Sequence, residues 1–266
     1  MVYTCFEMVR DCRANRPEGW SYFISNYLPV IRRIVRHYRP ESTVAEVDIV
    51  AAIRDPQSSL FASVDPVPER PFVAAMRQHV LGALDRMAPV PEPEMGIDLE
   101  SLTAALEPLT LLEKQAVWLE TMRYSPAETA AMLRSAPATI EKIRDKAGER
   151  LRAETNHWSA ALLPDNGRQL SLAAEASGTQ GCLPAKAFLD MLDGRTTWKG
   201  REDLERHAHG CWRCIDHFCR LVETVELLRG VQPLPDTEAK PLCELLGIPA
   251  AKQPGWKRLF GARTGA

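Results

Sequence analysis

The sequence contains no apolar run that approaches the roughly 20 residues needed to cross a bilayer. Residues 1–7 also lack the basic region followed by an apolar stretch that marks a secretory signal. Both absences lead us to expect no membrane span and a cytoplasmic location. Strict alternation of apolar and polar residues, which is typical of β-strands, is missing, as is any internal repeat. We therefore expect an all-α fold.

A large excess of charge of one sign is also missing. The formal net charge of -2 gives the chain no overall attraction to nucleic acid, so such a partner would have to meet a local patch. A disulfide framework is not expected, because the seven cysteines are an odd number and the cytosol is reducing. What the sequence has instead is a late cluster of cysteines, namely Cys182, Cys211, Cys214 and Cys219.

The length of 266 residues suggests about two or three domains. The helical pattern is interrupted twice, first by a proline-rich segment and then by a segment without sustained periodicity. We expect helical domains at residues 1–88, 99–155 and 182–230, linkers at 89–98 and 156–181, and a tail at 231–266.

The N-terminal part shows apolar residues at helical spacing. This spacing predicts helices over residues 20–38, 44–53 and 72–87. Pro29 falls inside the first of these segments and should kink it or begin a new helix. Together the three segments predict a small helical domain.

Three helical segments follow one another closely between residues 111 and 152. The first covers 111–122, and Ser125 then offers an N-cap that Glu128 completes as a capping box. A short helix over 126–133 and a tight turn lead to Pro137 in the first turn of the next helix. This order predicts a helix-turn-helix, whose second helix can enter a DNA major groove. A plain helical bundle fits the periodicity equally well.

The cysteine cluster contains a metal-ligand spacing. His207, Cys211 and Cys214 follow a His-x3-Cys-x2-Cys pattern, and Cys182 precedes them. Zinc takes four such donors tetrahedrally, so we predict a zinc site formed by Cys182, His207, Cys211 and Cys214. A closed set of this kind leaves no position for a catalytic water, so we expect no enzyme; a metal-dependent hydrolase would need an oxygen donor.

Two other interpretations of the cluster stay open. Cys211 and Cys214 can form a redox dithiol without metal. Alternatively, Cys182 is an unrelated buried thiol and His209 or Cys219 is the fourth ligand. If thiolates hold zinc, their oxidation to a disulfide would expel the ion, which suggests a redox switch as a hypothesis.

Three segments resemble known families. Residues 109–152, above all 124–133 and 147–152, resemble region 4 of extracytoplasmic-function sigma factors, the region that recognises a promoter element. Residues 182–228, including 189–194, resemble the zinc-binding anti-sigma domain. The N-terminal helices resemble sigma region 2, with 44–53 at the place of the helix that binds core RNA polymerase. The resemblance implies a sigma factor that binds core RNA polymerase and promoter DNA and is regulated in cis by intramolecular contact with its own zinc domain.

The predicted recognition helix departs from the family pattern. Arg134 stands where the family usually has a glycine, and Glu141 and Ile143 stand where basic residues are common. A sigma-like interaction protein that has lost promoter recognition is therefore the alternative. The candidates for DNA contact are Ser135, Thr139, Lys142, Arg144 and Lys146.

Two features follow the metal-ligand pattern. An apolar stripe from Ile215 to Leu228 predicts a helix that packs either on the sigma-like domains or within its own zinc-nucleated core. Further on, residues 252–263 combine basic and aromatic side chains. A membrane-surface or partner contact is conceivable there, but a solvated tail is the expectation.

Overall fold

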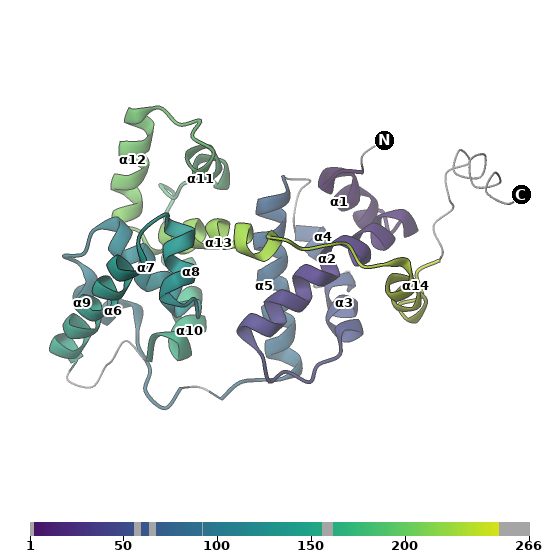
Figure 1. Cartoon of the computed structure of the whole chain (residues 1–266), viewed down its shortest axis with the longest axis horizontal. Coiled ribbons are helices and arrows are strands. Elements are labelled where there is room, and N and C mark those ends of the chain that lie inside the picture. The colour runs from purple at the N-terminus through teal and green to yellow at the C-terminus, as the bar shows by residue number, and fades with distance from the viewer. Residues whose placement is uncertain (1–2, 56–59, 64–67, 92, 156–161, 250–266) are drawn as a thin grey trace, which may run out of the picture. The chain divides into compact units, whose positions relative to one another are not determined.

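The computed structural model describes residues 3–55, 60–63, 68–91, 93–155 and 162–249. Over these residues the chain is built from helices and contains no strand, which confirms the all-α expectation (Figure 1). The chain divides into two compact units, one formed by Met1–Pro89 with Gly230–Ala266 and the other by Val90–Arg229. No described helix is long and apolar enough to cross a membrane.

The first unit surrounds an aromatic core. Trp20, Phe23 and Tyr27 on one helix meet Phe61 and Phe72 from two others, with ring centroids 4.9 to 6.4 Å apart. Edge-on contacts of this kind add to the apolar burial that stabilises the unit. Its helices are α1 (Cys5–Arg13), α2 (Pro17–Tyr38), α3 (Glu46–Arg54), α4 (Leu60–Ser63), α5 (Glu69–Met87) and α14 (Asp236–Leu245).

The three helices expected in the N-terminal part are present as α2, α3 and α5. Helix α2 continues through Pro29, so this proline lies inside one helix and does not begin a new one. Gly19 lets α1 approach α2 closely, because a Cβ at this position would lie 2.7 Å from the backbone nitrogen of Cys12.

The second unit is centred on α7, whose Trp118 is fully buried. Helix α7 packs against α8, α9, α10, α12 and α13. The helices of this unit are α6 (Leu99–Leu106), α7 (Leu111–Thr121), α8 (Pro126–Leu133), α9 (Pro137–Thr155), α10 (Leu163–Ala176), α11 (Ala185–Leu192), α12 (Trp198–His209) and α13 (Trp212–Leu228).

The interpretation of residues 156–181 as a linker does not hold for Leu163–Ala176, which form α10. Leu170 and Ala174 of this helix are buried, and Gly167 lies so close to the end of α7 that a Cβ would sit 2.0 Å from the carbonyl oxygen of Thr121. Buried Asn166 bonds to backbone groups of Met95 and Ile97. Because Gly167 and the Asn166 amide make these contacts, α10 needs few large apolar residues. Its apolar periodicity in the sequence is therefore weak.

The C-terminal tail is likewise only partly a tail. Residues 236–245 form α14, which packs against α2. Residues 252–263, for which a solvated tail was expected, lie outside the described residues. The parts expected as separate domains at 99–155 and 182–230 fall, apart from Gly230, within the single unit Val90–Arg229.

Candidate metal centre and helix-turn-helix

The helix-turn-helix forms where the sequence predicts it. The Ser125 hydroxyl accepts a bond from the backbone nitrogen of Glu128 at 3.3 Å, and the Glu128 carboxylate accepts one from the Ser125 nitrogen at 2.8 Å. This capping box begins α8. Arg134 ends it with φ +53°, a left-handed conformation that costs a residue other than glycine about 1 kcal/mol. Four apolar residues form the buried face of α9, namely Ile140, Ile143, Ala147 and Leu151.

The five candidate DNA-contacting side chains differ in exposure and in whether they are paired within the unit. Thr139 and Lys142 are exposed on α9, and Ser135 is half-buried in the turn before it. Arg144 instead forms an ion pair with Glu120 at 3.3 Å and also donates to the Tyr124 carbonyl. Lys146 donates to Glu113 at 2.7 Å.

The remaining charge on α9 is therefore mixed. Glu141 and Asp145 are exposed beside Lys142, while the two neighbouring basic side chains, Arg144 and Lys146, are occupied by carboxylates of α7. A nucleic-acid surface normally presents an excess of positive charge to the phosphates. The exposed charge beside Lys142 is therefore not such a positive excess.

The four predicted metal ligands converge. One donor atom from each of Cys182, His207, Cys211 and Cys214 lies within 4.8 Å of the other three. Cys182 Sγ and Cys211 Sγ are 3.6 Å apart, and His207 Nε2 lies 3.2 Å from Cys214 Sγ. The sulfurs of a tetrahedral site with Zn–S bonds of about 2.3 Å lie about 3.8 Å apart, so the cluster has the dimensions of such a site.

Three elements supply these ligands. His207 lies in the last turn of α12, Cys211 is the N-cap of α13, and Cys214 lies in the first turn of α13. Their spacing in sequence brings them to one point because the end of one helix meets the start of the next. Cys182 comes from the loop between α10 and α11, a placement that only the tertiary fold provides.

Backbone amides and a guanidinium support the thiol groups. The Thr179 nitrogen donates to Cys182 Sγ at 3.2 Å, and the Leu183 nitrogen donates to Cys214 Sγ at 3.5 Å. Desolvation works to raise the pKa of Cys182, but bonds from the Thr179 backbone, Arg213, Cys211 and the Thr179 side chain lower it to about 6. Thiolates are the metal-binding form of cysteine, so this environment favours a cation.

Cys214 is the buried member of the set, with an exposed fraction of 1%. Burial raises its pKa to about 12, and the neighbouring Cys211 and Cys182 act in the same direction. A bound divalent cation would offset both effects, because its charge favours the thiolate.

The alternative ligands lie elsewhere. Cys219 is fully buried and its thiol points to the Gln115 carbonyl oxygen, 3.8 Å away. The Nε2 atom of His209 lies 3.0 Å from the Leu109 carbonyl oxygen. Among the described residues, neither belongs to the group of converging donors. Cys182 is one of these donors, so it is not an unrelated thiol.

A feature that sequence reasoning missed is the polar contact between α13 and the helix-turn-helix. Trp118 Nε1 donates to Asp216 at 3.0 Å, and the Tyr124 hydroxyl donates to Glu223 at 2.8 Å. Asp216 also pairs with Arg220. Both carboxylates are almost completely buried, so α13 is fixed to α7 and to the start of α8. The sequence offered one signal of this contact, because Asp216 and Glu223 are carboxylates within the apolar part of a helix.

The apolar stripe of α13 is buried as expected at Ile215, Phe218, Leu221 and Val222, whereas Val225 is 39% exposed. The helix packs against α7, α8 and α10 of the same unit as well as against α11 and α12. The stripe thus packs within the metal-ligand segment and also on α7, α8 and α10.

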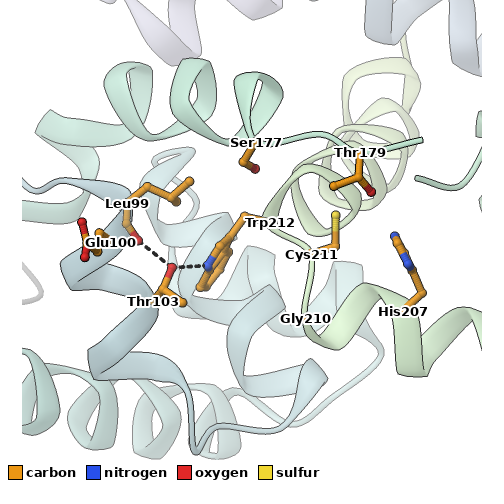
Figure 2. A pocket seen from close by; sticks show the side chains of 9 residues that line it. All are labelled: Leu99, Glu100, Thr103, Ser177, Thr179, His207, Gly210, Cys211 and Trp212. Carbon is orange, nitrogen blue, oxygen red and sulfur yellow. Dashed lines mark hydrogen bonds between the residues drawn. The ribbon is translucent and has the colours of Figure 1, made fainter. Parts of the chain in front are cut away.

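A cavity of about 540 Å³ opens beside two of the metal ligands (Figure 2). His207 and Cys211 line one end of it, and Trp212 lies toward the other, where its Nε1 donates to Thr103 at 2.7 Å. Thr103 in turn donates to the Leu99 carbonyl at 2.6 Å. Two of the four candidate ligands therefore lie at the wall of a cavity.

No protein-family model, curated protein or solved structure matches this chain.

Proposed function

We propose that this chain is a sigma-factor-like transcription protein that acts in the cytoplasm, binds core RNA polymerase and promoter DNA, and carries a structural zinc ion. The observation that carries the proposal is a capped helix-turn-helix of the predicted order beside a four-ligand cluster, with a buried polar contact between α7 and α13, the helix whose start supplies two of the ligands. The proposal includes no catalytic role, because three thiolates and one imidazole complete the coordination of zinc.

Zinc fits the cluster through its donor set. Sulfur and imidazole nitrogen are the donors that zinc accepts in closed tetrahedral sites, and amide bonds to the sulfurs orient them. A zinc ion held by Cys182, His207, Cys211 and Cys214 would join the loop before α11 to the junction of α12 and α13. Its role in the proposal is to hold the start of α13 in place.

Regulation in cis is proposed to act through α13. This helix begins at the metal ligands; its Asp216 accepts a bond from Trp118 of α7, and its Glu223 accepts one from Tyr124, which lies just before α8. The Tyr124 carbonyl, next to the second of these contacts, accepts a bond from Arg144 of α9. A change at the metal ligands would therefore reach the recognition helix through one continuous set of bonded residues.

Binding to polymerase and DNA can be tested with the full chain. Core RNA polymerase is mixed with the zinc-loaded protein, and the holoenzyme is used to select fragments from a random DNA library. We expect enrichment of a defined sequence, and we expect Lys142→Glu to weaken its capture at least about tenfold. Lys199→Glu, the same charge change at an exposed lysine of α12, is the control and should leave capture unchanged. Absence of core polymerase binding would refute the proposal.

A second candidate is favoured by the charge on α9. Because Arg144 and Lys146 are paired within the unit and Glu141 and Asp145 are exposed, the chain fits a sigma-like interaction protein that binds polymerase or another regulator without reading a promoter. Binding of core polymerase without enrichment of any DNA sequence would favour this second function over the first.

A further inference from the structure

Arg213 lies between two of the candidate metal ligands in the sequence and contacts a third. It is in the first turn of α13, after Cys211 and before Cys214. Its guanidinium donates to the thiol of Cys182, the ligand that comes from the loop between α10 and α11. Arg213 therefore joins that loop to the helix that carries two of the other ligands.

The loop leaves room for this side chain. The Cys182 nitrogen donates to the Thr179 carbonyl at 3.1 Å, and the Thr179 nitrogen donates to Cys182 Sγ at 3.2 Å, so residues 179–182 form a tight turn. Gly178 comes just before the turn, and a Cβ there would lie 2.2 Å from Arg213 Cδ. A side chain at position 178 would therefore displace Arg213 from the loop.

A carboxylate of α10 limits the direction of the guanidinium. One oxygen of Glu175 accepts from Arg213 Nε at 3.2 Å and from Arg213 Nη2 at 3.1 Å. The other oxygen accepts from Arg220 of α13 at 3.3 Å. Because the guanidinium is planar, two bonds from it to one carboxylate leave it little freedom to turn. Glu175 therefore restricts the orientations in which Arg213 can meet Cys182.

The ion pair between Arg213 and Glu175 contributes little to folding. The two side chains are 37% and 51% exposed, and water competes for an ion pair at such positions. A larger effect is expected on the metal site, because three thiolates carry more negative charge than a divalent zinc ion neutralises. A guanidinium beside one sulfur offsets this excess, and contacts that orient a ligand from outside the coordination sphere strengthen metal binding.

We propose that Arg213 is a positioning residue of the metal site, which orients the Cys182 thiolate toward the ion and is itself oriented by Glu175. The inference rests on the zinc site of the proposed function and adds to it two residues that do not bind the metal. Because Glu175 lies on α10, the position of that helix then contributes to the affinity for zinc.

Zinc affinity of the full chain, measured by competition with a chromophoric chelator, tests the role of Arg213. Arg213→Met removes the guanidinium but keeps an unbranched apolar stem, and we expect the dissociation constant for zinc to rise at least about tenfold. The matched control is Arg206→Met, which removes the same charge beside the ligand His207, where Arg206 pairs with Glu202 at 3.3 Å. The control should bind zinc as tightly as the unaltered chain.

A double-variant cycle tests whether Glu175 acts through Arg213. Glu175→Gln should also weaken zinc binding, and its matched control, Glu202→Gln, should not. The Arg213→Met, Glu175→Gln double variant should bind zinc no more weakly than Arg213→Met alone, because the carboxylate has no effect once the guanidinium is absent. Losses that add in the double variant would show that the two residues act separately, and they would overturn the part given to Glu175.

Cobalt(II) in place of zinc supplies a readout that a change in folding stability does not move. The charge-transfer band from thiolate sulfur to cobalt responds to the bonds that the sulfurs accept, so we expect a shift to longer wavelength in Arg213→Met and none in Arg206→Met. Gly178→Ala keeps every charge but displaces Arg213, and it should give the same shift. Gly181→Ala is its control in the same loop, because the nearest atom to that Cβ would lie 3.7 Å away.

The outcomes separate this inference from the proposed function. Absence of zinc and cobalt binding in the unaltered chain would overturn the proposed zinc site and the role of Arg213 with it. Tight zinc binding by the unaltered chain, together with equal affinities and equal cobalt spectra in Arg213→Met and Arg206→Met, would overturn the role of Arg213 and leave the zinc site standing.

Discussion

At the scale of single residues, the three candidate cysteine ligands differ from Cys219 in what their thiols face. Cys214 Sγ lies 3.2 Å from His207 Nε2, whereas Cys219 Sγ, five residues later on the same helix, points to a backbone carbonyl of α7. Both are buried, so burial alone does not distinguish a ligand from a core thiol. The direction in which the thiol points distinguishes the two.

We predict that Cys214→Ser abolishes zinc binding and that Cys219→Ser does not. A hydroxyl is a poor replacement for a thiolate in a four-donor site, and a three-donor remainder binds much more weakly. Metal content after purification, measured by inductively coupled plasma mass spectrometry, should fall from about one zinc per chain to near zero in the first variant. Loss of zinc from the Cys219 variant as well would show that the ligand set is wrong.

The close approach of α10 to α7 depends on the hydrogen atom that Gly167 has in place of a side chain. Gly167→Ala would place a Cβ 2.0 Å from the Thr121 carbonyl oxygen and push α10 from α7, which we expect to lower the free energy of unfolding by about 2 kcal/mol or more. Gly82→Ala in α5 is the control, because the nearest atom to its Cβ would lie 3.6 Å away; it should be neutral or stabilising by up to about 1 kcal/mol. Urea denaturation measures both.

At the scale of elements, Glu113 joins the start of α7 to α9. Its carboxylate accepts from the Thr110 nitrogen at 2.8 Å and from Lys146 at 2.7 Å. Burial works to raise the pKa of Glu113, but the bonds from Lys146 and Thr110 outweigh it and hold the pKa below 4.5. The carboxylate therefore stabilises the fold above pH 4.5, and this contribution is lost as the pH falls through the lowered pKa.

We accordingly predict that Glu113→Gln reduces stability at pH 7 by about 1 kcal/mol and makes stability less dependent on pH below 4.5. Chemical denaturation at several pH values measures this. The same change frees Lys146, so DNA capture by the holoenzyme should rise if α9 faces DNA. An unchanged pH dependence would mean that Glu113 does not titrate as its contacts require.

At the scale of the whole molecule, all four candidate ligands lie in one of the two units. Removal of zinc should therefore act on Val90–Arg229 and not on Met1–Pro89. We predict that chelation increases hydrogen exchange in α12 and α13 while α2 and α5 keep their protection, because structural zinc contributes folding free energy to the segment that binds it. Equal loss of protection in both units would contradict this.

The sequence by itself determined those features that depend on neighbouring residues. Capping by Ser125 and Glu128, the short helix that follows and the meeting of His207 with Cys211 and Cys214 are set by local bonds and helical spacing, and they lie where the sequence predicts them. The all-α class follows from the same periodicity.

Tertiary structure alone decided the features that join distant parts of the chain. It brought Cys182 to the other ligands and occupied Arg144 and Lys146 with carboxylates of α7. Helix α10 was missed because Gly167 and Asn166 make its contacts, and neither contributes to an apolar pattern. All these features have the same physical reason. A bond between segments far apart in the chain depends on how the helices pack, whereas helical periodicity in the sequence shows only which face of a helix is apolar.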